Sequence, residues 1–358
     1  MDLQKILKNS CGKRILIVGD AVADQFLSGT ISRVSREAPV FILKHEETET
    51  RPGGAANAAA NVAALGGVPI IVGLIGNDQN GDLLAESLRS VGVSTEHLIR
   101  KEKLATTTKL RVLAGPQFAV RQQVIRVDFE PDFTLTAAAT NQILRKIDEL
   151  APTANAIIVS DYGYGAATPE IFRIIRDLAH KHSIPVTVDS RFRLGEFKGA
   201  TAATPNLEEA QQLIARCQFS GSSQLSKTVA ETSSKDFLES SASLVNCLRE
   251  FLETEALLVT LGPAGMLIVD KKHGVPVRID AIGPKDPVDV TGAGDTVIAA
   301  FSLALAAGAD FREAAEIANH AGGIVVMKKG TAVANIDELA ASLERAVRMN
   351  GISAMSDR

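Results

Sequence analysis

The sequence is poor in aromatic residues and in cysteine: its 358 residues include no tryptophan, two tyrosines and three cysteines. Cys11, Cys217 and Cys247 lie far apart, and none belongs to a C-x-x-C spacing. An odd number of distant cysteines predicts neither a disulfide framework nor a zinc site, and it fits a reducing compartment. The six histidines likewise show no metal-ligand spacing.

Positive charge is not in excess either. Lysine and arginine total 38 against 42 for aspartate and glutamate, which gives a formal net charge of −4. Nucleic-acid binding needs a basic face that replaces counterions, so this balance argues against nucleic acid as the main partner. A local basic pocket remains compatible with it.

The sequence shows no leader pattern and no long hydrophobic run. Residues 1–13 are polar and charged, unlike the apolar centre of a signal peptide. The longest helix-like apolar stretch, residues 297–309, is shorter than the ~20 residues that a membrane span needs. We therefore expect a soluble, cytoplasmic protein without a membrane partner.

Three widespread site motifs are missing. The sequence has no G-x-x-x-x-G-K-[ST] loop, no G-x-G-x-x-G fingerprint and no G-x-S-x-G elbow. These absences exclude a P-loop nucleotide site, a dinucleotide fingerprint and the nucleophile elbow of the α/β-hydrolases.

What is present is an ordinary globular composition, with 46% hydrophobic and 22% charged residues, which suffices for a large core. Short β-branched apolar runs alternate with segments whose apolar residues return every three or four positions. The runs cover residues 14–18, 70–74, 156–160, 184–189 and 256–261, and the helical segments include 57–65, 83–91, 170–182 and 336–349. This alternation predicts one α/β domain over residues 1–358, with a mostly parallel sheet covered by helices on both faces.

Two regions break this rhythm. Residues 26–49 and 106–129 hold alternating polar and apolar segments with no helix between them, which predicts antiparallel strands in a small extra sheet, a lid over the main one. Residues 217–241 are rich in serine and threonine and predict a polar surface insertion.

The strongest chemical signal is the sequence DVTGAGD, residues 289–295, directly before an apolar helix. Its small residues leave the backbone N–H groups of Gly292, Ala293 and Gly294 pointing at one spot, where the helix dipole adds positive charge. Such a nest suits a transferring phosphoryl group, and Asp295 at the helix start could accept a proton from an attacking hydroxyl. The alternative is a tight turn with a charge that merely stabilises the helix.

A second glycine motif, RPGGAANAA, covers residues 51–59. Gly53 and Gly54 allow close backbone approach to a ligand, and Asn57 offers both a donor and an acceptor. Asp20 and Asp24 follow the first strand, at the sheet edge where α/β proteins bind ligands, and could hold sugar hydroxyls. The alternatives are tight helix packing for the glycines and a capped turn or solvated side chain for the aspartates.

Two further turns are candidate binding sites. Asn206 and Glu209 are three residues apart at a strand-to-helix turn, where they could organise a hydrated Mg²⁺ or form a helix capping box. Thr260, Gly262 and Gly265 lie in a glycine-bearing turn between two strands, which is either a plain hairpin or a backbone wall for a nucleotide.

Taken in this order, GGAAN and DVTGAGD resemble the motifs of the PfkB, or ribokinase-like, sugar kinases, over about residues 14–345. The resemblance implies a three-layer α/β/α sandwich with a small β lid, and an enzyme that uses ATP and Mg²⁺. It implies Asp295 as the catalytic base, with Gly292, Ala293 and Gly294 as the anion hole. It assigns the sugar to Asp20, Asp24, Gly53, Gly54 and Asn57, and the nucleotide to Asn206, Thr260, Gly262, Gly265 and Asn319. It assigns Mg²⁺ to Asn206 and Glu209, and a monovalent cation such as K⁺ to Asp289, Thr291 and Gly330.

Within that family the chain is similar to the heptose 7-phosphate kinases, which transfer the γ-phosphoryl of ATP to the anomeric hydroxyl. The similarity rests on SRVSREAPV (residues 32–40), RPGGAAN, TKLRVLA (residues 108–114) and IRVDFE (residues 125–130). A phosphorylated acceptor needs cations, and the candidates are Lys109, Arg111 and Arg126; the alternative for each is a solvated lid charge. The chain departs from the subgroup at Ser190-Arg191, in place of Pro-Lys, and at Tyr164, in place of lysine.

The sequence thus predicts an ATP-dependent sugar kinase with heptose 7-phosphate as the first candidate acceptor, and a homodimer formed through the lid strands. Two alternatives stay open. One is a kinase of the same fold for another sugar, sugar phosphate or nucleoside, which the two departures favour. The other is a non-catalytic sugar- or nucleotide-binding protein, against which the intact DVTGAGD argues.

Overall fold

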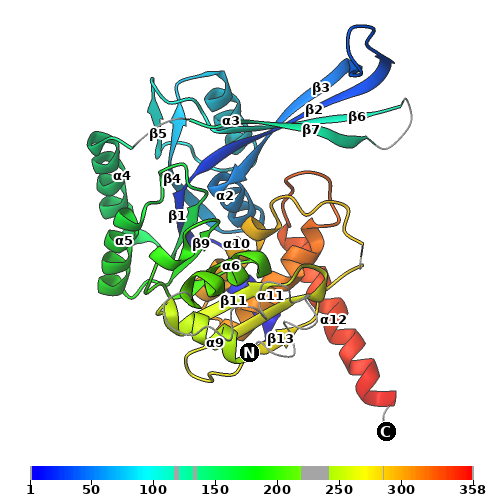
Figure 1. Cartoon of the computed structure of the whole chain (residues 1–358). Helices are drawn as coiled ribbons and strands as arrows, with labels where there is room; N and C mark the ends of the chain where they lie inside the picture. The colour runs from blue at the N-terminus through cyan, green and yellow to red at the C-terminus, as the bar shows by residue number, and fades with distance from the viewer. Residues whose placement is uncertain (1, 117–120, 132–134, 219–241, 285, 357–358) are drawn as a thin grey trace.

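The computed structural model describes residues 2–116, 121–131, 135–218, 242–284 and 286–356 (Figure 1). Of the predicted polar insertion, residues 219–241 lie outside the described residues.

Within these residues the main sheet has nine strands in the order β13-β12-β11-β10-β9-β8-β1-β4-β5. Neighbours from β11 to β5 pair in parallel, whereas β12 is antiparallel to both β11 and β13. The strands are β1 (Arg14–Gly19), β4 (Val68–Gly76), β5 (Leu98–Lys101), β8 (Ala156–Asp161), β9 (Val186–Ser190), β10 (Ala202–Ala203), β11 (Ala256–Thr260), β12 (Met266–Asp270) and β13 (Val277–Ile279). The five apolar runs of the sequence all form strands of this sheet.

Helices cover both faces of the sheet, which makes the three-layer α/β/α sandwich that the sequence predicts. One face carries α1 (Leu3–Ser10), α2 (Ala55–Ala64), α3 (Gln79–Ser90), α10 (Ala293–Ala306), α11 (Phe311–Val325) and α12 (Ile336–Ser356). The other carries α4 (Ala137–Leu150), α5 (Pro169–His182), α6 (Leu207–Gln218) and α9 (Ala242–Phe251). Short 3-10 turns lie at η1 (Ala151–Thr153), η2 (Leu194–Glu196) and η3 (Gly262–Ala264). No helix of the described residues is both long and apolar enough to span a membrane.

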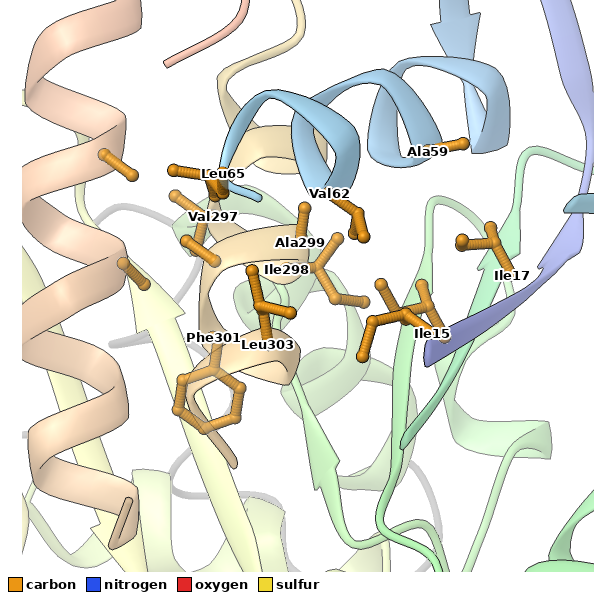
Figure 2. Close-up of a cluster of buried hydrophobic side chains, with 14 of the residues drawn as sticks. Ile15, Ile17, Ala59, Val62, Leu65, Val297, Ile298, Ala299, Phe301 and Leu303 are labelled. Atoms are coloured by element: carbon orange, nitrogen blue, oxygen red, sulfur yellow. The ribbon is translucent and has the colours of Figure 1, made fainter. Parts of the chain in front are cut away.

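The central strand β1 shows how the sequence produces these layers. Successive side chains of a strand point to opposite faces. Ile15 and Ile17 belong to the core on one face, and Leu16 and Val18 to the core on the other. All four are fully buried, which explains why β1 reads as a continuous apolar run. Figure 2 shows Ile15 and Ile17 on the side of the sheet covered by α2 and α10.

A second sheet projects from the body as two paired hairpins (Figure 1). Its order is β3-β2-β6-β7, formed by β2 (Ala21–Val34), β3 (Phe41–Gly54), β6 (Thr108–Gly115) and β7 (Gln122–Phe129). β2 pairs antiparallel with β3, and β6 with β7, while β2 and β6 join the hairpins in parallel. β2 starts directly after β1, and β3 leads into α2, so the root of this small sheet lies at the carboxyl edge of the main one.

The packing of α10 generates a stability prediction. Phe301 is fully buried within it (Figure 2), so Phe301→Ala leaves a cavity and should lower the free energy of unfolding by about 3–5 kcal/mol. Phe192 is 59% exposed, and Phe192→Ala should change it by less than about 0.5 kcal/mol. Urea unfolding of both variants measures the difference, and equal losses would contradict this account of the core.

Candidate active site

The helix α10 starts at a turn that only glycine can form. Gly292 has φ +76°, and a Cβ there would lie 2.4 Å from Asn57 Nδ2. No side chain caps the first turn of α10. Of the three predicted donors, Ala293 is already engaged, because its N–H donates to the carbonyl of Val290 at 3.2 Å. Gly292 borders one cavity, and Ala293 and Gly294 border a second. The predicted anion nest therefore separates two hollows of the molecule.

Asp295, in the first turn of α10, is held at both carboxylate oxygens. Tyr162 donates its hydroxyl to Oδ1 at 2.8 Å, and Asn57 donates from Nδ2 to Oδ2 at 2.9 Å. The residue is only 3% exposed, and burial raises its pKa to about 7. A carboxyl group with a pKa near neutrality, on the wall of a cavity, is suited to accept a proton from a bound hydroxyl.

The cavity beside Asp295 has a volume of about 250 Å³ and collects charge from several elements. Its charged lining residues are Asp24, Lys109, Arg111, Arg191 and Asp295. Gly54, Thr291 and Gly292 add backbone to its wall. Carboxylates and cations thus face one space at the carboxyl edge of the sheet, which suits a polar, anionic ligand.

The root of the small sheet supplies two of these cations. Arg111 on β6 forms a buried ion pair with Asp24 on β2, and Thr331 also contacts that carboxylate. Burial raises the pKa of Asp24, and the Arg111 guanidinium opposes this. Lys109 lies two residues before Arg111, with Nζ 5.4 Å from the centroid of the Tyr162 ring and 5.8 Å from that of Tyr164. Burial lowers the pKa of Lys109.

Four of the residues predicted to bind sugar do not line this cavity. Asp20 is buried and accepts the backbone N–H groups of Tyr162, Tyr164 and Ala166, so its carboxylate holds a turn. Asn57 does not face the cavity, and its Nδ2 instead donates a hydrogen bond to Asp295, which does. The last two are Gly53 and Arg126. A Cβ on Gly53 would lie 2.6 Å from Asp24 Oδ2, so its role is to leave room for that carboxylate.

Arg126 is placed differently from the other predicted cations. Its side chain is 47% exposed, and it pairs with Asp128 on the same strand. The physical reason is that every residue of β7, the outer strand, is exposed, whereas β6 is flanked by strands on both sides. Arg126 is therefore a solvated charge of the small sheet, which was the alternative to a phosphate-binding role.

The second cavity, of about 170 Å³, brings together four of the five residues predicted for the nucleotide, and Asn206, the fifth, is not part of its lining. The four lining residues are Thr260 at the end of β11, Gly262 in η3, Gly265 directly after η3, and Asn319 in α11. Asn319 donates from Nδ2 to the carbonyl of Asp280, which fixes its side chain in the wall. Met266, Ile282, Val290 and Val297 make the lining largely apolar. A mostly apolar cavity beside a helix N-terminus suits a nucleotide base and its phosphates.

Asn206 and Glu209 form the capping box that was the simpler interpretation of their spacing. The Asn206 N–H donates to Glu209 Oε2, and the Glu209 N–H donates to Asn206 Oδ1, each at 2.9 Å. Burial raises the pKa of Glu209, and burial together with Glu209 and Asp295 raises the pKa of Asp189 well above its usual value.

These carboxylates fit a hydrated Mg²⁺. The negative charge of Glu209 disfavours the ionised form of Asp189, and a divalent cation between them would relieve that repulsion. No group of three or more histidine, cysteine or acidic side chains is arranged to hold a metal within the described ranges. Mg²⁺ commonly takes one or two carboxylates and completes its shell with water and phosphate, so two protein carboxylates suffice.

The proposed monovalent-cation residues are connected through one carboxylate. Asp289 accepts the backbone N–H groups of Thr291 and Gly330, each at 2.9 Å. Burial opposes the effect, but these two bonds hold the pKa of Asp289 below its usual value. Asp289 therefore carries a negative charge between two loops, as a cation site requires.

Tyr162 and Asp189 were not among the predicted site residues. Both lie at the carboxyl ends of strands, Tyr162 directly after β8 and Asp189 within β9. The same edge rule that selected Asp20 and Asp24 would have selected them. Asp161 stabilises the turn after β8. Its buried carboxylate accepts hydrogen bonds from Nε and Nη2 of Arg193 and from the N–H of Gly163 in the turn.

Comparison with known proteins agrees with this geometry. The profile of the pfkB family carbohydrate kinases matches residues 13–338. The "Bifunctional protein HldE" of Ectopseudomonas mendocina is 38% identical over 332 residues, and that of Pseudomonas aeruginosa strain PAO1 is 37% identical over 332 residues. Each comparison covers 92% of this chain, and the chain spans 64% of the length of either relative.

Solved structures of low sequence identity share the fold. A putative ribokinase from Agrobacterium tumefaciens superposes with a TM-score of 0.70 at 18% identity, over 94% of this chain and 99% of that one. Phosphofructokinase-2 from Escherichia coli, in complex with substrates and products, gives a TM-score of 0.70 at 19% identity, over 93% and 99%. Ribokinase from Arabidopsis thaliana, complexed with ribose and ATP, gives 0.63 at 18% identity, over 93% and 99%.

The support beneath the site can be tested through Arg193. Arg193→Ala leaves the carboxylate of Asp161 buried without its partner and should lower the free energy of unfolding by about 3 kcal/mol. Arg312→Ala, which removes an exposed ion pair with Glu316 in α11, should cost about 0.5 kcal/mol or less. Urea unfolding compares the two variants. Equal effects would mean that Asp161 does not depend on Arg193.

Proposed function

This chain belongs to the pfkB family of carbohydrate kinases, and we propose that its acceptor is a sugar that already carries a phosphate, with heptose 7-phosphate as the first candidate. The phosphoryl donor in this proposal is ATP with Mg²⁺. The observation that carries the proposal is the cavity beside Asp295, where a base, an uncapped helix N-terminus and three cations meet.

The reaction needs little from the protein beyond placement and charge. The acceptor hydroxyl gives its proton to Asp295 as its oxygen bonds to the γ-phosphorus, and the bond from that phosphorus to the bridging oxygen of ADP breaks. The N–H groups of Gly292 and Gly294, with the dipole of α10, would offset charge on the transferring group. Asp295 later releases the proton to solvent. The two cavities meet at this turn, so donor and acceptor would approach it from opposite sides.

The cations argue for a phosphorylated acceptor. A neutral sugar needs hydroxyl partners, and Asp24 together with Gly54 offers them. Lys109 and Arg191 add positive charge that a neutral sugar does not require, whereas Arg111 is already paired with Asp24. Arg191 reaches the cavity in place of the subgroup's lysine, and so keeps a positive charge at that position. Relatives named HldE at 38% identity support heptose 7-phosphate within this class.

The donor side rests on the second cavity and on the acidic residues near it. The apolar cavity around Thr260 and Asn319 would take the adenine, which leaves the phosphates at the N-terminus of α10. Asp189 and Glu209 would hold Mg²⁺ mainly through water, where the ion would offset charge on the phosphates. Asp289, Thr291 and Gly330 are proposed to hold a monovalent cation behind the 292–294 turn.

The small sheet is proposed to act as a lid and as a dimer contact. Ile125, Val127 and Phe129 on β7 are each more than one third exposed, and β7 is the outer strand of the sheet. An apolar strand with an open edge favours pairing with a second copy. A closed lid would keep water away from the donor phosphate, which limits wasteful hydrolysis.

A different acceptor is the second candidate, because Tyr164 stands where the heptose kinases have lysine. The Tyr164 hydroxyl donates to Glu130 at 2.7 Å, so it brings no charge to the cavity. Transfer to fructose, another sugar phosphate or a nucleoside would keep the mechanism and change the substrate. A binding protein without turnover would have no use for a base of pKa about 7 at this position.

The direct test measures ADP release with Mg·ATP over a panel of acceptors. Heptose 7-phosphate should give turnover, and Asp295→Asn should reduce it about 10²–10⁴-fold because the base is lost. The panel also contains heptose, fructose, ribose, hexose phosphates and nucleosides. Calorimetry should show that the variant still binds ATP, since the nucleotide cavity is not lined by Asp295.

The outcomes of this test separate the candidates. Turnover on another sugar alone, still dependent on Asp295, would replace the acceptor and keep the kinase. ATP binding without turnover on any acceptor would favour the binding protein.

The role of Lys109 is tested by Lys109→Met, which removes the charge and keeps a long apolar side chain. The variant should lose about 10–100-fold in kcat/KM for the phosphorylated acceptor, the effect of one charge-assisted hydrogen bond. The loss for the same sugar without phosphate should be much smaller. Lys44→Met, an exposed lid position on β3, is the matched control. Equal losses for both sugars would remove Lys109 from phosphate recognition.

A further inference from the structure

Tyr162 connects three parts of the site. Its hydroxyl donates to Asp295 Oδ1 at 2.8 Å, and the face of its ring lies 5.4 Å from Lys109 Nζ on the small sheet. A Cβ on Gly54 would lie 3.2 Å from the ring carbon Cε2, so the ring packs against the glycine motif. None of the motifs that indicate a sugar kinase includes this residue.

The backbone of Tyr162 is fixed independently of its side chain. The N–H groups of Tyr162, Tyr164 and Ala166 all donate to the carboxylate of Asp20, at 2.8 to 3.0 Å. The Gly163 N–H donates to Asp161, which Arg193 holds in turn. A turn with this many bonds cannot shift without breaking several of them, so the phenol is presented to Asp295 in one position.

The direction of the hydrogen bond is also fixed. Burial, and then the negative charge of Asp295, raise the pKa of Tyr162 well above its usual value. The phenol therefore keeps its proton, and that proton can only be donated. A carboxylate that accepts a hydrogen bond is stabilised in its ionised form.

We propose that Tyr162 is a positioning residue for the catalytic base: its hydroxyl holds the Asp295 carboxylate in orientation and favours the ionised form that accepts the proton of the acceptor hydroxyl. Asn57 does the same for the other oxygen. Each oxygen keeps a lone pair for the acceptor, because an ionised carboxylate has about four. This proposal rests on the proposed function, in which Asp295 is the base.

Other charged groups face the cavity or approach Asp295 without replacing the phenol. Asp24 on β2 disfavours the ionised form of Asp295, and Lys109 on β6 favours it. Arg111 on β6, paired with Asp24, and Arg191 after β9 line the same cavity, and Asp189 on β9 interacts with Asp295 as a like charge. Burial is the dominant influence and raises the pKa of Asp295 to about 7. The hydrogen bonds of Asn57 and Tyr162 oppose burial, so loss of either should raise that pKa further.

The first experiment compares Tyr162→Phe with Tyr164→Phe. Both keep the ring, but only the first removes the bond to Asp295, since Tyr164 bonds Glu130. The acid limb of the kcat profile should move up by about one pH unit in Tyr162→Phe and stay in place in Tyr164→Phe. Well above the limb, kcat should recover toward wild type, and KM for Mg·ATP should be unchanged. Thermal unfolding establishes that both variants are folded.

A second experiment needs no acceptor, because the sequence has only two tyrosines. In the Tyr164→Phe protein, biosynthetic 3-fluorotyrosine labels Tyr162 alone, and ¹⁹F NMR follows it directly. Its resonance should titrate with an apparent pKa near or below 7, and the titration should vanish with Asp295→Asn. Fluorine makes the phenol a stronger donor. The pH of the acid limb of the kcat profile should therefore be highest with phenylalanine at position 162, lower with tyrosine, and lowest with fluorotyrosine.

The two experiments distinguish failure of this proposal from failure of the proposed function. An acid limb identical in wild type and Tyr162→Phe, or a ¹⁹F titration that persists with Asp295→Asn, overturns the positioning role. Absence of turnover on every acceptor, with the ¹⁹F titration intact, overturns the kinase and keeps the Tyr162–Asp295 bond. If Tyr162→Phe does not fold, the fluorotyrosine protein carries the test by itself.

Discussion

Burial of one carboxyl group, Asp295, is the constraint on which the site depends. An ionised carboxylate out of water is costly unless donors bind it, and here the side chains of Asn57 and Tyr162 do so, while Asp295 itself lies at the positive end of the α10 dipole. The two donors come from α2 and the turn after β8, and the carboxylate from α10, which are distant in sequence. The packing of these elements on the sheet therefore sets the environment that places the pKa of Asp295 at about 7.

Two other buried carboxylates stabilise the turns behind the cavity. Asp20 accepts backbone N–H groups, and Asp161 accepts hydrogen bonds from Arg193. They do not face the ligand space, yet they fix the residues that do. Acidic side chains near a ligand site thus divide into those that meet the ligand and those that hold the loop, and only the hydrogen-bond partners separate the two groups.

The sequence predicted the layers and the sheet well because both follow from local periodicity. The run at residues 14–18 is apolar on both faces, and it became the central strand β1. Thr260, Gly262, Gly265 and Asn319 line one cavity together with Gly294, whereas Asn206 does not line it. The prediction that these residues serve one ligand came from the family resemblance, because no sequence periodicity links α11 to the turn after β11.

The remaining site residues depend on tertiary geometry that a linear pattern does not contain. Asp20 and Asp24 are four residues apart and look alike in sequence, but one faces a turn of backbone N–H groups and the other a cavity. Arg126 and Arg111 sit opposite each other on paired strands, and only the position of β7 at the sheet edge exposes Arg126. The partner of Asp295 at Tyr162 was missed because the two are 133 residues apart.

The strands of the small sheet are long relative to the site that they serve. β2 has 14 residues, which corresponds to about 45 Å of extended chain, and Asp24 lies near its root. A rigid tilt of about 5° at the root would carry the far end through ~4 Å at that strand length. The hairpin has in this sense the geometry of a lever, with Asp24 on its short arm. A small rotation at the base would be magnified at the far end, and a restraint at the far end would in turn limit the movement of the Asp24 carboxylate.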